Sequence, residues 1–203
     1  MEDRLPLTST IRALQGGDAP LIADIITNAF DDDPLMLWVF GQARKARASY
    51  AAIARSVYLR VGFGHVAADG AGGALWLPPG ASAAPPSGLA GLAISLRILA
   101  AGGLRALFRA EQTSLAVLSH RPTEPHYYLF AIGVRREERR RGLGTALMAE
   151  TLARCDREGL PAHLESSKAQ NVAFYGRFGF QVTHRLAVAE GGPDVWLMRR
   201  EPR

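Results

Sequence analysis

Residues 134–145 read Val134-Arg135-Arg136-Glu137-Glu138-Arg139-Arg140-Arg141-Gly142-Leu143-Gly144-Thr145: an apolar segment runs into a basic, glycine-bearing turn and then into a helical pattern. The first turn of a helix presents unpaired N–H groups and about half a positive charge, which suits a phosphate. Gly142 and Gly144 lack a Cβ, so a ligand can approach the backbone closely. Arg139, Arg140 and Arg141 add cationic donors. The turn therefore predicts a site for a phosphate or pyrophosphate.

Other interpretations of this turn have to be weighed. The arginines can form a solvated charge run while the glycines only shape a turn. A dinucleotide-binding turn would need a third glycine where Leu147 stands, and no Gly-Lys-Ser/Thr of a Walker loop is present. A nucleic-acid binder could use residues 135–141 as a phosphate clamp, but Glu137 and Glu138 interrupt the run. The helix-turn-helix, zinc-finger and RNP patterns are also missing.

Strand and helix patterns alternate around the turn. Apolar runs predict strands at 127–134 and 162–166 and closing strands at 180–188 and 194–198, with helices at 142–158 and 171–178 between them. Upstream, Asp18 is expected to cap a helix that ends near Phe30, a second helix covers 45–60, and Asp69-Gly70 joins two hairpin strands at 65–68 and 74–77. We therefore expect one α/β domain over residues 1–203.

The predicted helix at 142–158 has a distinct inner face. Thr145, Met148, Ala149, Leu152 and Cys155 share one side at helical spacing, while Glu150, Arg154, Arg157 and Glu158 share the other. The helix is therefore expected to dock on the sheet, with the basic turn at its exposed amino end.

A second motif, Asn171-Val172-Ala173-Phe174-Tyr175-Gly176-Arg177-Phe178-Gly179-Phe180, follows the next strand. Asn171 suits a helix N-cap and Gly179 suits the position that ends a helix. The spacing places Asn171, Phe174, Tyr175 and Phe178 on one helix face. Taken alone, this segment favours a short helix that packs its aromatic side chains, with Tyr175 as a core tyrosine.

Together the two motifs resemble the GNAT acetyltransferases. The pattern Val134-x-x-x-x-Arg139-x-x-Gly142-x-Gly144 is similar to the family's Q/R-x-x-G-x-G/A signature, although Arg136 stands where many members have proline. The second motif resembles the family's N-x-x-F-Y-x-x-x-G-F. Segments at 120–125 and 161–165 are most similar to the puromycin N-acetyltransferase branch. The resemblance implies the GNAT fold, in which helices flank a central mixed, mostly antiparallel, twisted sheet.

The resemblance also implies a cofactor and a reaction. Acetyl-CoA would act as co-substrate, and its acetyl group would pass directly, in a ternary complex, to a primary amine of a small molecule such as an aminonucleoside or another antibiotic. A protein or peptide amine acceptor, and a sensor that binds acyl-CoA without turnover, stay open as alternatives. The residues expected at acetyl-CoA are Ile132, Gly133, Val134, Arg139, Arg140, Arg141, Gly142, Leu143, Gly144, Thr145, Asn171, Phe174 and Tyr175.

Two side chains are candidates for the chemistry. By the resemblance, Tyr175 lies beside the thioester sulfur and protonates the leaving thiolate as the general acid. Glu165 is the carboxylate expected on the amine side, because strand alternation places it with His163 and Ser167 on one face. A structural Glu165 is the alternative. The acidic run Asp31-Asp32-Asp33 either attracts a cationic acceptor or is a solvated helix end.

Composition limits the remaining expectations. The chain has a formal charge of +5 and a single cysteine, Cys155, which cannot form an internal disulfide. We expect a cytoplasmic monomer or homodimer that binds neither nucleic acid nor membrane. No metal is expected either, because His163 has no second His or Cys at ligand spacing. The apolar stretch at 92–108 is expected to be a packed helix, with a membrane-surface helix as the alternative.

Overall fold

The computed structural model of the protein describes residues 10–82 and 86–203. Its centre is a seven-stranded sheet in the order β1-β2-β3-β4-β5-β7-β6. Only β4 and β5 run parallel, and every other neighbouring pair is antiparallel. The mixed, mostly antiparallel sheet predicted from the sequence is thereby confirmed. The strands are β1 (Ile11–Ala13), β2 (Phe63–Ala67), β3 (Gly72–Leu77), β4 (Tyr127–Val134), β5 (Ala162–Ser166), β6 (Gln181–Ala187) and β7 (Asp194–Arg200).

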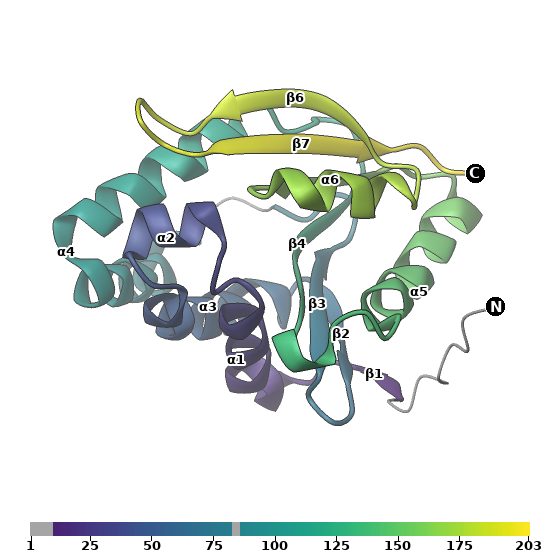
Figure 1. Ribbon diagram of the computed structural model, residues 1–203, viewed down its shortest axis with the longest axis horizontal. Helices are drawn as coiled ribbons and strands as arrows, with labels where there is room; N and C mark the ends of the chain where they lie inside the picture. The colour runs from purple at the N-terminus through teal and green to yellow at the C-terminus, as the bar shows by residue number, and fades with distance from the viewer. Residues whose placement is uncertain (1–9, 83–85) are drawn as a thin grey trace.

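Helices cover both faces of this sheet (Figure 1). On one face α1 packs on β3 and β4, and on the other α5 packs on the same two strands. Each face has its own core: Tyr127 and Leu129 point to the α5 face, and Tyr128 points to the α1 face. The helices are α1 (Ala19–Ala29), α2 (Pro34–Phe40), α3 (Arg47–Ile53), α4 (Gly88–Leu118), α5 (Leu143–Glu158) and α6 (Ala169–Gly176).

The two parallel strands separate after a short paired stretch. β4 pairs with β5 only as far as Leu129, which lies opposite Leu164, although β4 continues to Val134 alongside β3. At the point of separation β4 carries a bulge, because Leu75 pairs with Ala131 and Trp76 with Leu129, leaving Phe130 as the extra residue. The edge of β4 from residue 130 to residue 134 is therefore left without a strand partner on the β5 side.

Several details of the sequence prediction are corrected. The strand β1 and the helix α2 were not predicted, and the helix α6 begins at Ala169 after the N-cap Lys168, so Asn171 lies in its first turn and is not the cap. Asp18 precedes α1, but its side chain bonds Arg12 at 2.7 and 2.9 Å and caps no α1 amide. The hairpin turn is confirmed, since Gly70 has a φ of 73°.

The buried side of α5 also differs from the prediction. Its buried residues are Leu143, Leu147, Met148, Thr151, Leu152 and Cys155, whereas Thr145 and Ala149 are exposed. The actual face is rotated around the helix from the predicted one. Thr145 therefore lies at the surface of the first turn, beside the basic loop.

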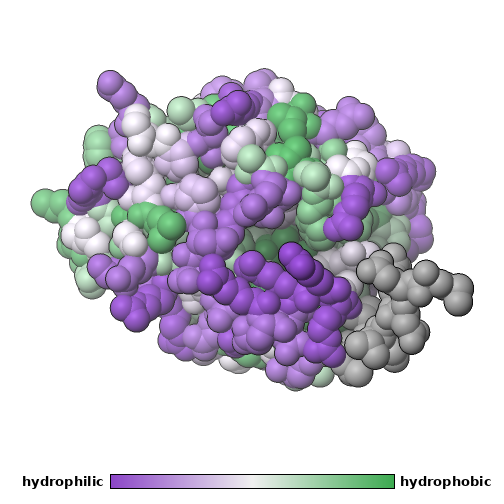
Figure 2. Space-filling model, viewed as in Figure 1, coloured by the Kyte–Doolittle hydropathy of each residue, from purple (hydrophilic) through white to green (hydrophobic). Residues whose placement is uncertain are grey.

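The helix α4 is broken near its middle at Gly103, whose φ is 71° and ψ is −169°. It contacts α2 and α3, yet large apolar side chains such as Leu89, Leu104 and Leu115 are more than half exposed. Apolar surface is visible at the α4 end of the molecule in Figure 2. By length and composition α4 could also cross a membrane. The expectation of a packed helix therefore holds only for its buried side (Ile94, Ala106, Val117).

Candidate functional site

The basic turn forms a loop of unusual backbone conformation between β4 and α5. After a short 3-10 helix, η4 (Arg136–Glu138), the φ of Arg140 is 66° and that of Gly142 is 80°. Gly142 is the N-cap of α5 and has no side chain with which to cap the first amides. Left-handed residues beside open amides form concave anion sites, and a non-glycine residue held at positive φ is typical of ligand sites. The loop can hold a phosphate.

The arginines of this loop differ in how they are used. Arg139 donates from Nη2 to the carbonyl oxygen of Ala29 at 2.8 Å, and Arg141 pairs with Glu138. The exposed side chain of Arg140 has no hydrogen-bond or ion-pair partner in the described part of the chain. Arg140 is therefore the most available of the three side chains for a phosphate, and Arg139 holds the loop against the end of α1.

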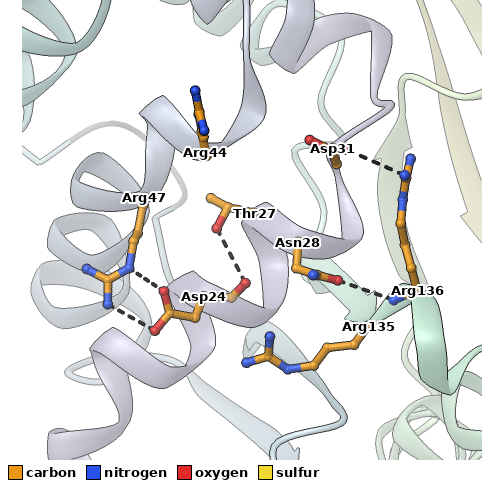
Figure 3. A pocket seen from close by; sticks show the side chains of 8 residues that line it. All are labelled: Asp24, Thr27, Asn28, Asp31, Arg44, Arg47, Arg135 and Arg136. Carbon is orange, nitrogen blue, oxygen red and sulfur yellow. Dashed lines mark hydrogen bonds and ion pairs between the residues drawn. The ribbon is translucent and has the colours of Figure 1, made fainter.

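A cavity of about 600 Å³ lies between α1 and the start of the loop. It is lined by Asp24, Thr27, Asn28, Asp31, Arg44, Arg47, Arg135 and Arg136. Figure 3 shows how its walls are tied together: the amide of Arg136 donates to Asn28, its guanidinium pairs with Asp31, and Arg47 pairs with Asp24. None of the residues predicted from the two motifs lines this cavity. Its contacts instead fix the start of the loop to the end of α1, and α1 to α3.

The two sequence motifs meet in space at Gly144. A Cβ added to Gly144 would stand 3.3 Å from the ring of Phe174 and 3.9 Å from Val134. The first turn of α5 thus packs directly against α6 and the end of β4. Ile132 and Val134 are half-buried on the α5 face, while Gly133 faces α1, where an added Cβ would stand 2.7 Å from that of Ala29. Leu143 is buried, so it offers only its backbone.

Tyr175 lies on the buried side of α6, 7% exposed. Its ring contacts Phe174 and Phe180 edge-on, with centroids 5.2 and 6.0 Å apart. Burial raises the pKa of its phenol well above the usual value, and the charge of Asp33 raises it further. The phenol is therefore a proton donor throughout the neutral range. Asn171 is half-buried on the same helix.

Glu165 lies at the centre of a buried polar cluster. Its Oε1 accepts from Arg121 at 3.0 Å and lies 3.2 Å from Nε2 of His163, and its Oε2 accepts from the hydroxyl of Tyr128 at 2.7 Å. Burial opposes ionisation of this carboxyl, but the hydrogen bond from His163 and the charge of Arg121 outweigh it and lower the pKa. Glu165 is an ionised carboxylate on the α1 side of the sheet, and it shares its face with His163, as strand alternation predicted.

The acidic run after α1 is divided among three partners. Asp31 pairs with Arg136 at 3.5 Å, and Asp32 pairs with Arg136 and with Lys168, the N-cap residue of α6. The hydroxyl of Ser167 donates to Asp33 at 2.5 Å. Asp31 and Asp32 are exposed and Asp33 is buried, and the run ties the α1–α2 connection to the basic loop and to the start of α6.

Cys155 gives a prediction about chemical reactivity. It is fully buried on α5, and burial raises the pKa of its thiol to about 11. At neutral pH the thiol stays protonated and shielded, so a maleimide dye should label the native protein very slowly and the guanidinium-unfolded protein at one site per chain. Rapid labelling of the native protein, followed by mass spectrometry, would contradict this burial.

These features are similar to those of known proteins. Residues 98–180, which include the loop and both motif helices, match the model of the acetyltransferase (GNAT) family. Over this segment, which holds the basic loop, α5 and α6, the chain is similar to acetyltransferases. The fold is the GNAT fold, as the likeness to solved GNAT structures shows.

Individual relatives extend the similarity to nearly the whole chain. An uncharacterised N-acetyltransferase of Schizosaccharomyces pombe is 28% identical over 94% of this chain and 83% of its own length. A structure from Corynebacterium glutamicum, described as histone acetyltransferase HPA2 and related acetyltransferase, is 24% identical with a TM-score of 0.71, covering 97% of this chain and 98% of that one. A polyamine N-acetyltransferase of Drosophila melanogaster, which forms N-acetylagmatine, is 18% identical with a TM-score of 0.63. The match covers 95% of this chain and 99% of that one.

Proposed function

We propose that the protein acetylates a primary amine of a small molecule, with acetyl-CoA lying along β4, the basic loop and α6. The observation that carries the proposal is the contact between Gly144 and Phe174. It brings the anion-binding end of α5 next to the helix that carries Tyr175. A pantetheine chain that starts at a pyrophosphate on α5 would then follow the unpaired edge of β4.

The acceptor class is supported by the fold's other members and by the charges near Tyr175. The polyamine acetyltransferase of Drosophila melanogaster acts on a small amine with the same fold. In the present chain β5 carries the carboxylate of Glu165, and Ser167, just after β5, donates to the carboxylate of Asp33. A relationship to puromycin N-acetyltransferases in particular remains a proposal, as does a cytoplasmic location.

The proposed reaction needs hydrogen-bond donors for the thioester carbonyl, a proton for the leaving sulfur and an acceptor for the proton of the amine. Backbone N–H groups near Ile132 polarise the thioester carbonyl, as in an oxyanion hole. The neutral amine attacks the carbonyl carbon, the C–S bond breaks, and the thiolate takes the phenolic proton of Tyr175. The phenolate then regains a proton from water, and the proton released by the amine leaves through water or Glu165. Each group begins and ends the cycle in the same protonation state.

Glu165 is proposed to act on the amine side, and its substitution tests this role. Glu165→Gln removes the negative charge but keeps the shape, so transfer should slow while affinity for CoA stays nearly intact. The change also leaves Arg121 without its charge partner, which should lower the free energy of unfolding by about 3–5 kcal/mol. Single-turnover kinetics at a temperature where the variant is folded separates the two effects.

A matched control for this variant is Glu158→Gln. Glu158 also binds a tyrosine and an arginine, accepting from Tyr127 at 2.6 Å and from Arg154 at 2.7 Å, but it is exposed on α5. The Glu158→Gln variant should transfer acetyl groups as the native enzyme does. If Glu165→Gln is equally fast across the neutral pH range, then Glu165 is a structural residue only.

The function itself is tested by an acceptor screen. The enzyme is incubated with acetyl-CoA and a panel of small amines, with release of the CoA thiol and the mass of each amine as readouts. We expect one class of amine to gain a single acetyl group in step with thiol release. Binding of CoA without transfer to any amine or peptide in the panel would favour a sensor instead.

A further inference from the structure

The cavity between α1 and the start of the basic loop holds more positive than negative charge. Its walls carry two carboxylates and the guanidinium groups of Arg44, Arg47, Arg135 and Arg136. Each carboxylate is already paired, Asp24 with Arg47 and Asp31 with Arg136. The cavity therefore has an excess of two positive charges. Like charges gathered around one space favour an anion between them.

The two guanidinium groups that make up the excess are held in place by uncharged oxygen atoms. Arg135 is half-buried and donates from Nε to the carbonyl oxygen of Gly70 at 2.8 Å. Arg44, on the 3-10 helix η2 (Ala43–Ala46), donates from Nε to the side-chain oxygen of Gln42 at 2.9 Å. Neither has a carboxylate of the described residues within ion-pair distance, and Figure 3 shows both without a link to the acidic walls. Their terminal nitrogens are therefore available to a ligand.

The rest of the wall, which comes from α1, is polar but uncharged. Asn28 is half-buried and accepts the amide of Arg136 on its side-chain oxygen at 3.2 Å, which leaves its NH2 group to donate. The hydroxyl of Thr27 donates to the carbonyl oxygen of Ala23 at 2.8 Å, which leaves the hydroxyl oxygen to accept. Every residue that lines the cavity is polar or charged, and its volume of about 600 Å³ is typical of a small-molecule site. The cavity suits a hydroxylated, anionic small molecule.

We propose that this cavity binds a phosphorylated small molecule of the sugar phosphate class, which acts as an effector of the enzyme. The planar fork of an arginine matches the oxygens of a phosphate. A phosphate monoester carries about two negative charges at neutral pH, which balances the excess of the cavity. None of the residues predicted to hold acetyl-CoA lines the cavity, so both molecules can be bound at once.

The effector role follows from where Arg135 and Arg136 lie in the chain. They join the end of β4 to the basic loop, whose Arg139 is bound to the carbonyl oxygen of Ala29 at 2.8 Å. A phosphate on Arg135 would hold the start of the loop against α1 as well. A loop that is already ordered binds a second ligand at a lower entropic cost. This coupling rests on the proposed function, because it requires the pyrophosphate of CoA to lie on the loop.

Three substitutions test the proposal in different directions. Arg44→Gln removes one unmatched charge at an exposed side chain, so the fold should be unaffected. Lys45→Gln is the matched control, because it makes the same change of charge at the next residue, which is exposed but does not line the cavity. Asp24→Asn raises the excess of positive charge instead. Its pair with Arg47 is about half exposed, so its loss costs little stability.

Binding is measured by calorimetry with glucose 6-phosphate and ribose 5-phosphate, with glucose as the uncharged comparison, on the enzyme with and without CoA. The wild-type enzyme should bind a sugar phosphate and not glucose. Arg44→Gln should weaken this binding by roughly 10-fold or more, and Asp24→Asn should strengthen it by roughly 2–5-fold. Lys45→Gln should bind as the wild type does. A saturating sugar phosphate should raise affinity for CoA by roughly 5-fold or more.

The outcomes separate the proposal from the proposed function. A wild-type enzyme that binds neither sugar phosphate, or equal affinity in Arg44→Gln and Lys45→Gln, would overturn the site. Displacement of the sugar phosphate by CoA, or unchanged affinity for CoA, would overturn the effector role. Acetylation of amines without any sugar phosphate reports on the proposed function alone, and binding to the CoA-free enzyme reports on the cavity alone.

Discussion

Replacement of Tyr175 by phenylalanine should lower the single-turnover rate of acetyl transfer by roughly 10²–10⁴-fold, the usual contribution of a general acid. Phe keeps the ring and its contacts with Phe174 and Phe180 and deletes only the hydroxyl. The fold and the affinity for CoA should survive. Quench-flow measurement is preferred to steady-state turnover, because a rate-limiting product release would hide the chemical step.

Tyr127→Phe provides the comparison for this experiment. Tyr127 is a second buried tyrosine of the same core, and its hydroxyl donates to Glu158 at 2.6 Å, away from α6. The Tyr127→Phe variant should transfer acetyl groups at the native rate. If Tyr175→Phe is as fast as the native enzyme while binding CoA normally, Tyr175 is a packing residue and water protonates the sulfur.

The second large effect is expected at the anion site. Gly144→Asp places a carboxylate in the first turn of α5 and a Cβ 3.3 Å from the ring of Phe174. A hydrogen bond to a charged group contributes about 1.5–3 kcal/mol. Loss of one such bond, with added charge repulsion, should weaken CoA binding by at least about 10-fold. Calorimetry with CoA measures this directly.

Two further variants show which effect dominates at Gly144. Gly144→Ala adds only the Cβ and should weaken binding less than the aspartate does. Gly17→Asp makes the charged substitution at an exposed glycine with nothing within 4 Å of its Cβ position, and it should bind CoA normally. Unchanged affinity in Gly144→Asp would mean that the pyrophosphate does not lie at the start of α5.

Local patterns in the sequence were enough to predict the central part of the fold. The strand at 162–166 has its predicted bounds, and alternation correctly placed His163 and Glu165 on one face, where they lie 3.2 Å apart. It also placed Glu165 and Ser167 on the same side of β5. These features depend on the period of a strand, which a sequence records directly.

Contacts between distant segments could not be predicted in this way. Arg121 and Glu165 are 44 residues apart, and Asp33 and Ser167 are 134 apart, so no periodicity relates them. The helix α2, whose first residue is Pro34 after the cap Asp33, was not predicted either. An Asp-Pro pair is typical of a helix start. Because proline also follows the ends of helices, the pair alone does not distinguish the two.

A crystal structure of the protein with bound CoA tests the central claim most directly. The account predicts that the pyrophosphate lies on the amides of residues 142–145, that the pantetheine follows the open edge of β4 beyond Phe130, and that the sulfur lies within hydrogen-bond reach of the Tyr175 hydroxyl. CoA bound elsewhere, for example with its phosphates in the arginine-lined cavity beside Arg44 and Arg135, would contradict it.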